Sequence, residues 1–167
     1  MYHFTPDPVM YYGSFTIYNR QNRPVFEIVS SDSEMSNRWF LVDANRTVLY
    51  GLHMGFDPQR RPILRVIHNE KLVGVVRPGK DKLKGFYTLK TPKTTYIFRG
   101  NPFKGEFKLV SPLGVAMESK YLPGSMDQFA IKITTPRQPM LLLAVAIGLT
   151  GFRVPKRHVV DSRMVRF

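Results

Sequence analysis

Residues 138–152, QPMLLLAVAIGLTGF, form the one segment of the chain that is apolar on every side. An α-helix without a polar face must be buried all round. The strongly apolar part, residues 140–149, is about half of the roughly 20 residues that a helix needs to cross a membrane. The pattern therefore favours a buried core helix over an interfacial element or a transmembrane span.

The chain before this helix consists of short runs typical of β-strands, separated by turn residues. Alternating runs rich in Val, Ile, Tyr, Phe and Thr recur at intervals of roughly 8–12 residues, which is typical of a sandwich or a barrel. The expected strands span residues 11–19, 24–29, 38–42, 47–54, 63–68, 72–77, 85–89, 95–99, 106–110, 115–121 and 129–134. The fifth and sixth of them should form a hairpin around Asn69 and Glu70.

The apolar helix decides between these two architectures. A sandwich has no obvious place for it, whereas a closed barrel of this many strands has an interior too wide for strand side chains alone to fill. We therefore expect a single domain over residues 1–167: a mainly β protein with a closed antiparallel barrel of about 11–12 strands around a central C-terminal helix. Residues expected to be nearly fully buried are Leu142, Ala144, Val145, Ala146 and Leu149. Residues 158–167, HVVDSRMVRF, should add a last strand that closes the barrel.

This pattern resembles the tubby C-terminal-like superfamily. The resemblance is carried by hairpins such as residues 15–29, FTIYNRQNRPVFEIV, by the Ser111-Pro112-Leu113-Gly114 turn, and by the apolar segment at residues 138–152. Tubby proteins, LURP-one-related proteins and phospholipid scramblases share this fold, a barrel of twelve strands around a C-terminal apolar helix. The chain looks like a short bacterial-type member of the group.

The resemblance also implies a kind of ligand. Tubby domains bind phosphoinositide headgroups through basic side chains on the barrel. Scramblases carry a palmitoylated Cys-rich segment and a calcium-binding acidic segment, whereas this chain has no cysteine and no run of carboxylates. The resemblance therefore implies lipid binding rather than scramblase activity or calcium binding.

No catalytic or metal-binding signature occurs in the chain. The histidines are His3, His53, His68 and His158, and their spacing fits none of the common metal-binding motifs. Without cysteine there is no thiolate nucleophile, iron–sulfur cluster or Cys-ligated zinc site. The nucleophile-elbow and phosphate-loop patterns are also missing. We expect a non-enzymatic protein without a cofactor or a bound metal.

Charge is the strongest functional signal. The chain has 25 Lys and Arg residues against 12 Asp and Glu residues, a net charge of +13, and such a field attracts polyanions. The candidate anion-binding residues are Arg60, Arg61, Arg65, Arg77, Lys80, Lys82 and Lys84. Because a hairpin over residues 63–77 returns both of its ends to one edge, the two loops that carry most of these residues should be neighbours. Further basic residues follow the helix: Arg153, Lys156, Arg157, Arg163 and Arg166.

These observations predict a binding module that recognises anionic phospholipid headgroups at the cytoplasmic face of a membrane. The first residues lack the charged and apolar regions of a signal peptide, so we expect a cytoplasmic protein, peripheral at the membrane. Phe56 or Met54 could reach into the lipid interface, or belong to the core. The alternatives are a protein-interaction or regulatory module, a nucleic-acid-binding barrel, and a basic surface that is only solvated.

Overall fold

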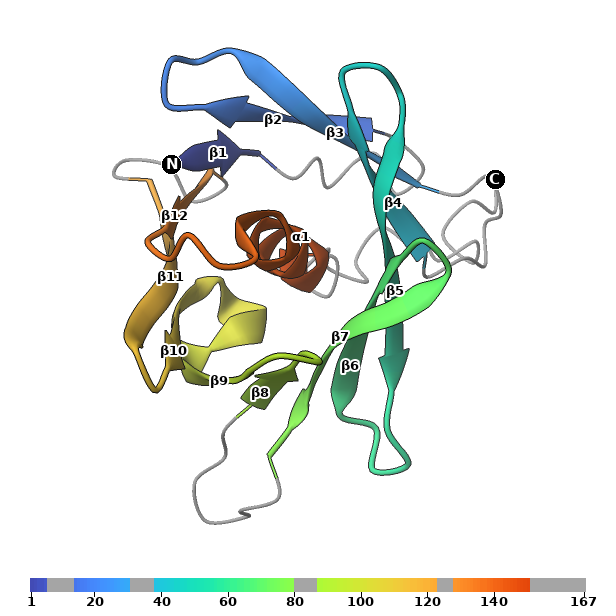
Figure 1. Ribbon diagram of the computed structural model, residues 1–167, viewed down its shortest axis with the longest axis vertical. Helices are drawn as coiled ribbons and strands as arrows, with labels where there is room; N and C mark the ends of the chain where they lie inside the picture. The colour runs from blue at the N-terminus through green and yellow to red at the C-terminus, as the bar shows by residue number, and fades with distance from the viewer. Residues whose placement is uncertain (6–13, 31–37, 80–86, 123–127, 151–167) are drawn as a thin grey trace, which may run out of the picture.

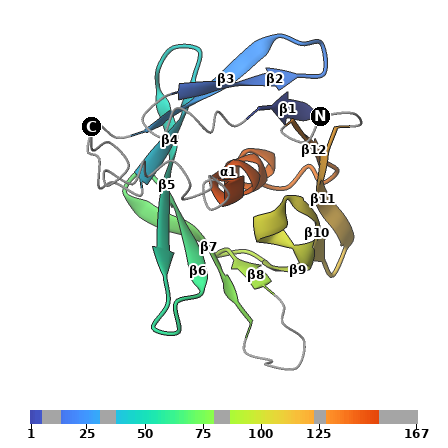
Figure 2. The same cartoon turned by 180° about the vertical axis from the view of Figure 1, so that it is seen from behind.

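The computed structural model describes residues 1–5, 14–30, 38–79, 87–122 and 128–150. Within them, twelve antiparallel strands follow one another around a closed barrel, and an α-helix lies inside the ring (Figures 1 and 2). The strands are β1 (Tyr2–Phe4), β2 (Ser14–Asn19), β3 (Pro24–Ser30), β4 (Arg38–Asp43), β5 (Val48–Phe56), β6 (Pro62–His68), β7 (Lys71–Pro78), β8 (Tyr87–Lys90), β9 (Thr95–Asn101), β10 (Glu106–Ser111), β11 (Gly114–Tyr121) and β12 (Phe129–Ile133). A short 3₁₀ helix, η1 (Pro102–Lys104), and the helix α1 (Pro139–Thr150) complete the described elements. The predicted fold class is confirmed.

The barrel is closed by its first strand. β1 pairs with β12, where Phe4 lies opposite Phe129, and with β2, where Tyr2 lies opposite Asn19. The sequence analysis did not predict β1 and assigned the closing strand to residues 158–167, which lie outside the described residues. The ring of described strands is already continuous through β1, so its closure does not require residues 158–167, and a closed ring leaves no strand edge unpaired.

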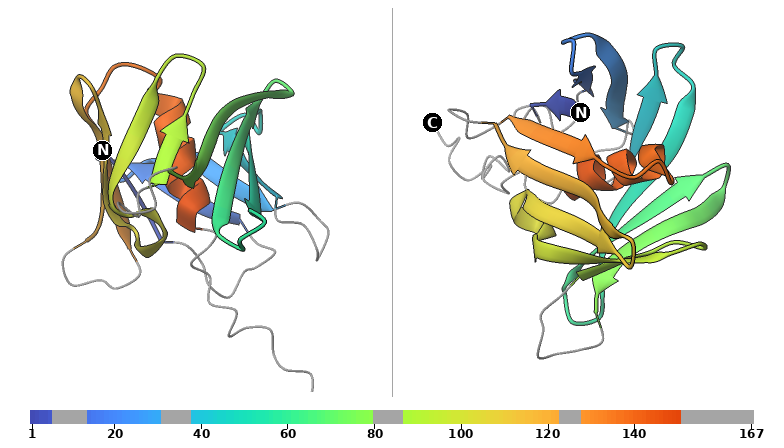
Figure 3. Two further views of the ribbon diagram at one scale, coloured as in Figure 1. Left: turned by 90° about the horizontal axis from the view of Figure 1, so that it is seen from below. Right: turned by 60° about the vertical axis from the view of Figure 1, so that its left-hand side comes forward.

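The helix α1 fills the bore of the barrel. Every residue from Leu141 to Thr150 is buried, and Leu142 and Val145 are 0% exposed, as the sequence predicted. The helix runs between the strand walls and contacts β5, β6 and β12 (Figure 3). Because the surrounding strands cover all of its sides, the sequence of the helix needs no polar face.

The strands present alternate residues to the bore and to the outside. In β6, Leu64 and Val66 are buried against the core, whereas Arg65 between them is exposed. The same alternation in β5 turns Leu52 inward and His53 outward. Since a strand has a period of two residues, charged side chains at the intermediate positions collect on the outer wall.

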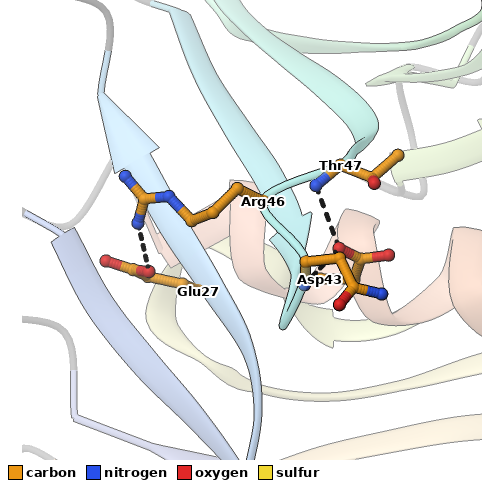
Figure 4. A network of polar contacts seen from close by, with 5 residues as sticks. Glu27, Asp43, Arg46 and Thr47 are labelled. Carbon is orange, nitrogen blue, oxygen red and sulfur yellow. Dashed lines mark hydrogen bonds and ion pairs between the residues drawn. The ribbon is translucent and has the colours of Figure 1, made fainter.

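The two ends of the barrel differ. Because neighbouring strands are antiparallel, the odd-numbered strands all end at one end, the odd rim, and the even-numbered strands all end at the other, the even rim. At the even rim, the Oδ1 atom of Asp43 accepts a hydrogen bond of 2.9 Å from the backbone N–H of Thr47 (Figure 4). In the same turn, Nη1 of Arg46 donates to Oε2 of Glu27 at 2.8 Å and ties the turn to β3.

The hairpin predicted around Asn69 and Glu70 is confirmed by β6 and β7. Leu64 pairs with Val76, and both turn residues have positive φ angles, 48° for Asn69 and 62° for Glu70. Positive φ at both central residues is the signature of a type I′ turn, whose twist matches that of the flanking strands. The hairpin therefore fixes which residues of β6 and β7 share the outer wall.

Candidate anion-binding surface

The structure separates the predicted basic residues into two groups. Arg60 and Arg61 lie in the turn between β5 and β6 at the odd rim, whereas Arg65 and Arg77 lie on the outer wall within β6 and β7. Lys80, Lys82 and Lys84 lie outside the described residues. The start of β6 and the end of β7 lie side by side at the odd rim, because the two strands form a hairpin. A joint surface of Arg60, Arg61, Lys80 and Lys82 stays a prediction.

Arg61 forms hydrogen bonds within its own turn. Its Nε donates to Oδ2 of Asp57 at 2.7 Å, and its backbone N–H donates to Oδ1 of the same carboxylate at 2.8 Å. Desolvation raises the pKa of Asp57, but the hydrogen bonds from Arg61 and Gln59 and the charge of Arg61 outweigh it and lower that pKa. An anion at this turn would have to compete with Asp57 for Arg61.

A row of basic side chains crosses the outer wall from β4 to β6. Arg38 pairs in register with His53, and His53 pairs with Arg65, so the three residues lie side by side on neighbouring strands. Directly opposed residues on one face of an antiparallel pair have Cβ atoms about 4.5–5.5 Å apart. The next position along the row is Val75 of β7, which is followed by Lys90 of β8.

Glycine leaves room for one of these side chains. Gly55 follows His53 on the outer face of β5, and a Cβ added there would lie 3.7 Å from Nη1 of Arg65. The guanidinium of Arg65 therefore lies over β5, where a side chain in place of Gly55 would touch it. We call the residues Arg38, His53, Arg65, Arg77 and Lys90 the basic wall.

The four strands that carry His53, Arg65, Arg77 and Lys90, β5 to β8, contain no acidic residue. Within the described residues, Arg65, Arg77 and Lys90 have no ion-pair partner. The opposite side of the barrel differs, because there Lys108 lies 3.9 Å from Glu118. Arg65, Arg77 and Lys90 are therefore not neutralised by any carboxylate among the described residues.

This surplus of positive charge affects the pKa of His53. Burial lowers the pKa of His53, and the neighbouring charges of Arg38 and Arg65 lower it further. The lowered pKa favours the neutral imidazole, and protonation of His53 would add a third positive charge to the row. A bound anion would reverse this effect, because a negative charge favours the protonated form.

The other two histidines of the described residues, His3 and His68, have structural partners. Nδ1 of His68 lies 2.6 Å from the carbonyl oxygen of Leu49, and Nε2 of His3 lies 3.0 Å from Oδ1 of Asn22. Among the described residues, no group of three or more His, Asp or Glu side chains could hold a metal ion. In that part of the chain, no helix is both long and apolar enough to cross a membrane.

Arg38, His53 and Lys90, which complete the basic wall, were not predicted from the sequence. Each of them belongs to an expected strand or directly follows one, but their proximity depends on the register between neighbouring strands. Of the two apolar candidates, Met54 packs against the core, whereas Phe56 is 58% exposed at the odd-rim end of β5. Phe56 is thus an exposed apolar side chain on one of the strands of this surface.

Together, the fold and this surface define a closed twelve-stranded antiparallel β-barrel with a helix in its bore and a basic outer wall. No family model matches the chain, and no curated protein matches it. The chain is similar to the X-ray structure of the protein AT5G01750 from Arabidopsis thaliana, with a TM-score of 0.58 and 11% sequence identity. The alignment covers 87% of this chain and 88% of that chain. At this level of identity, the likeness shows the fold alone.

Proposed function

We propose that the protein is a non-enzymatic binding module that holds anionic phospholipid headgroups against the basic wall. The observation that carries the proposal is the group of Arg65, Arg77 and Lys90 on strands without acidic residues. Exposed Arg and Lys side chains without a carboxylate partner are free to pair with phosphate oxygens, which Arg binds in a bidentate fashion.

The expected strength suits peripheral attachment. Each Lys or Arg close to an anionic leaflet contributes about 1 kcal/mol, so three of them contribute about 3 kcal/mol, or roughly a hundredfold in binding. The basic residues at positions 80–84 and 153–166 could add to this attraction, although none of them is needed for the argument.

The resemblance to the tubby C-terminal-like superfamily supports the same ligand class. Tubby domains bind phosphoinositide headgroups through basic side chains on the barrel, and the proposed surface of this chain also lies on the outside of a barrel. We therefore propose that the chain is a short member of this superfamily that acts at the cytoplasmic face of a membrane. A protein partner and a nucleic acid are the competing ligands that the experiment must separate.

Vesicle co-sedimentation tests the proposal. The full chain is mixed with neutral phosphatidylcholine vesicles, with vesicles that also contain phosphatidylserine, and with vesicles that contain a phosphoinositide. We expect pelleting with both anionic compositions and not with the neutral one. Pelleting should weaken as salt rises, because the screening length falls from about 10 Å at 0.1 M to about 3 Å at 1 M.

A mobility-shift assay with single-stranded and double-stranded nucleic acid runs beside it. A shift without vesicle pelleting would overturn the lipid proposal in favour of nucleic acid. The absence of both would leave a protein-interaction module and would also overturn it.

A further inference from the structure

A second candidate site lies at the even rim, away from the basic wall. A pocket of about 500 Å³ opens between the β8–β9 turn, the β10–β11 turn and the segment that leads from β12 into α1. This volume lies within the range of roughly 300–1,000 Å³ that is typical of small-molecule sites. The sequence analysis attached no function to these three segments.

The lining of the pocket is positively charged. Lys93 and Arg137 both line it, and none of its lining residues is acidic. Neither cation has an ion-pair partner among the described residues. A negatively charged group that enters this pocket would therefore meet two cations that are not already paired.

A tyrosine also lines this pocket. Tyr96 lines the pocket although it is only 3% exposed, and its hydroxyl has no hydrogen-bond partner within the described residues. Burial raises the pKa of Tyr96, and the positive charge of Arg137 partly offsets that rise. A tyrosine hydroxyl without a hydrogen-bond partner is an available donor for a ligand.

Hydrogen bonds hold each wall of the pocket in place. Oγ1 of Thr91 accepts from the backbone N–H of Thr94 at 3.0 Å, and Oγ of Ser111 accepts from that of Leu113 at 3.1 Å. The third wall is tied to β11, because the backbone N–H of Thr134 donates to the carbonyl of Ala116 at 2.9 Å. A ligand would enter a pocket whose walls are already positioned, which lowers the entropic cost of binding.

One side of the pocket is apolar and open to solvent. Leu113, which lines it together with Pro112, is 76% exposed. Val115 and Ile97 on the adjoining strands are also exposed. An apolar part of a ligand could cover Leu113 while a charged part pairs with the cations.

We propose that this pocket binds a small amphiphilic acid. Its phosphate monoester or carboxylate group pairs with Lys93 and Arg137 and accepts a hydrogen bond from Tyr96, and its apolar part lies against Leu113. The proposal uses no residue of the basic wall, so it can hold or fail independently of the proposed membrane function.

Isothermal titration calorimetry with hexyl phosphate, hexanoate, hexanol and inorganic phosphate tests this proposal in a phosphate-free buffer of low ionic strength. We expect hexyl phosphate or hexanoate to bind at one site per chain, inorganic phosphate to bind more weakly, and hexanol not to bind. The variant Arg137→Gln should weaken binding about tenfold or more, because a hydrogen bond to a charged group is lost. Leu113→Ser should lower the affinity for hexyl phosphate towards the weaker affinity for inorganic phosphate, because the apolar contact is lost.

Controls locate the site. Arg20→Gln changes the net charge as much as Arg137→Gln does, but lies in the β2–β3 turn and should leave binding unchanged. In ¹⁵N–¹H spectra, the amide signals of Lys93, Leu113 and Arg137 should shift on titration. The proposal is overturned if no probe saturates, if hexanol binds as well as the acids do, or if Arg137→Gln binds like the wild-type chain.

The same variant distinguishes two sources of the acid. If Arg137→Gln loses hexyl phosphate but still pellets with anionic vesicles, the natural ligand is a free molecule. If it loses both, the natural ligand is the headgroup of a membrane lipid, and the pocket proposal stands with that source.

Discussion

Leu64 of β6 packs so closely on Gly148 of α1 that a Cβ atom added to Gly148 would lie 2.8 Å from Cδ2 of Leu64. Real Cβ atoms essentially never approach another atom so closely. Leu64 is 0% exposed and surrounded by the core, so its side chain has little freedom to move aside. The helix and the barrel wall therefore fit each other at a position where only glycine leaves enough room.

The first prediction is that Gly148→Ala destabilises the protein. Intrinsic helix propensity alone would favour alanine by about 1 kcal/mol. Overpacking in a dense core typically costs about 1–3 kcal/mol, so we expect a net loss of about 1 kcal/mol in the free energy of unfolding. Urea denaturation measures it. The double variant Gly148→Ala/Leu64→Val should recover part of the loss, and a single variant more stable than the wild-type chain would contradict the close fit.

The second prediction concerns burial of the helix. Leu142 is 0% exposed, so Leu142→Ala should lower the free energy of unfolding by about 2–5 kcal/mol. Leu142→Asp should unfold the protein, because an unpaired buried charge costs an amount comparable to the total stability of roughly 5–15 kcal/mol. Leu113→Asp places the same charge on an exposed turn and should keep the native circular dichroism spectrum. A folded Leu142→Asp variant with an unchanged melting temperature would rule out the buried helix.

The third prediction concerns closure of the barrel by β1. The ring of Phe4 stacks on Phe15 at 5.6 Å and on Phe129 at 5.7 Å, which joins β1 to both of its neighbours. Phe4→Ala should therefore lower the free energy of unfolding by about 3–5 kcal/mol in chemical denaturation. Leu113→Ala removes an exposed side chain and serves as the control with little expected effect. Equal stability of the two variants would show that β1 contributes little to the barrel.

The sequence predicted the architecture because two local signals combined. Regularly spaced strands indicated a sandwich or a barrel, and a helix apolar on all sides required a bore to lie in. The three residues of β1 are too few to show an alternating pattern. The partner of β1 lies at the far end of the barrel domain, and Tyr2 pairs with Ile131. Such a contact follows from closure of the ring, and no local sequence pattern predicts it.

The candidate surface was harder to predict because it depends on register. Arg38, His53 and Arg65 come from three strands, and they meet only because each pair lies directly opposite. Irregularities between Leu41 and Val42 and between Val66 and Ile67 shift the pairing within the same strands. Since a slip of one residue moves a side chain to the other face, alternation alone could not bring these residues together.

The fourth prediction concerns the pH dependence of His53. Its pKa in the folded protein is lowered from the ordinary value of 6.5, so the unfolded chain binds the proton more readily. Its contribution to stability is therefore complete above pH 6.5 and decreases as the pH falls from there towards the folded pKa. We expect the free energy of unfolding, measured by urea denaturation from about pH 8 down to about pH 5, to change less with pH for His53→Gln than for the wild-type chain.

The same histidine reports on the proposed ligand. In an NMR titration of its ring protons, Arg65→Gln should raise the pKa of His53, because one of the neighbouring positive charges is removed. Soluble inositol phosphate should raise it as well if an anion binds at the basic wall. A pKa of His53 that responds to neither change would argue against electrostatic coupling across this row.

The most direct test of the central claim is vesicle co-sedimentation of two charge-reversed variants with matched net charge. Arg65→Glu/Lys90→Glu reverses two cations of the basic wall, and Arg20→Glu/Arg23→Glu reverses two in the β2–β3 turn. We predict that the wall variant loses binding to phosphatidylserine vesicles by about a hundredfold or more, whereas the turn variant binds within a few fold of the wild-type chain. Both variants should keep the wild-type melting temperature. Equal binding by the two variants would contradict the assignment of lipid binding to the basic wall.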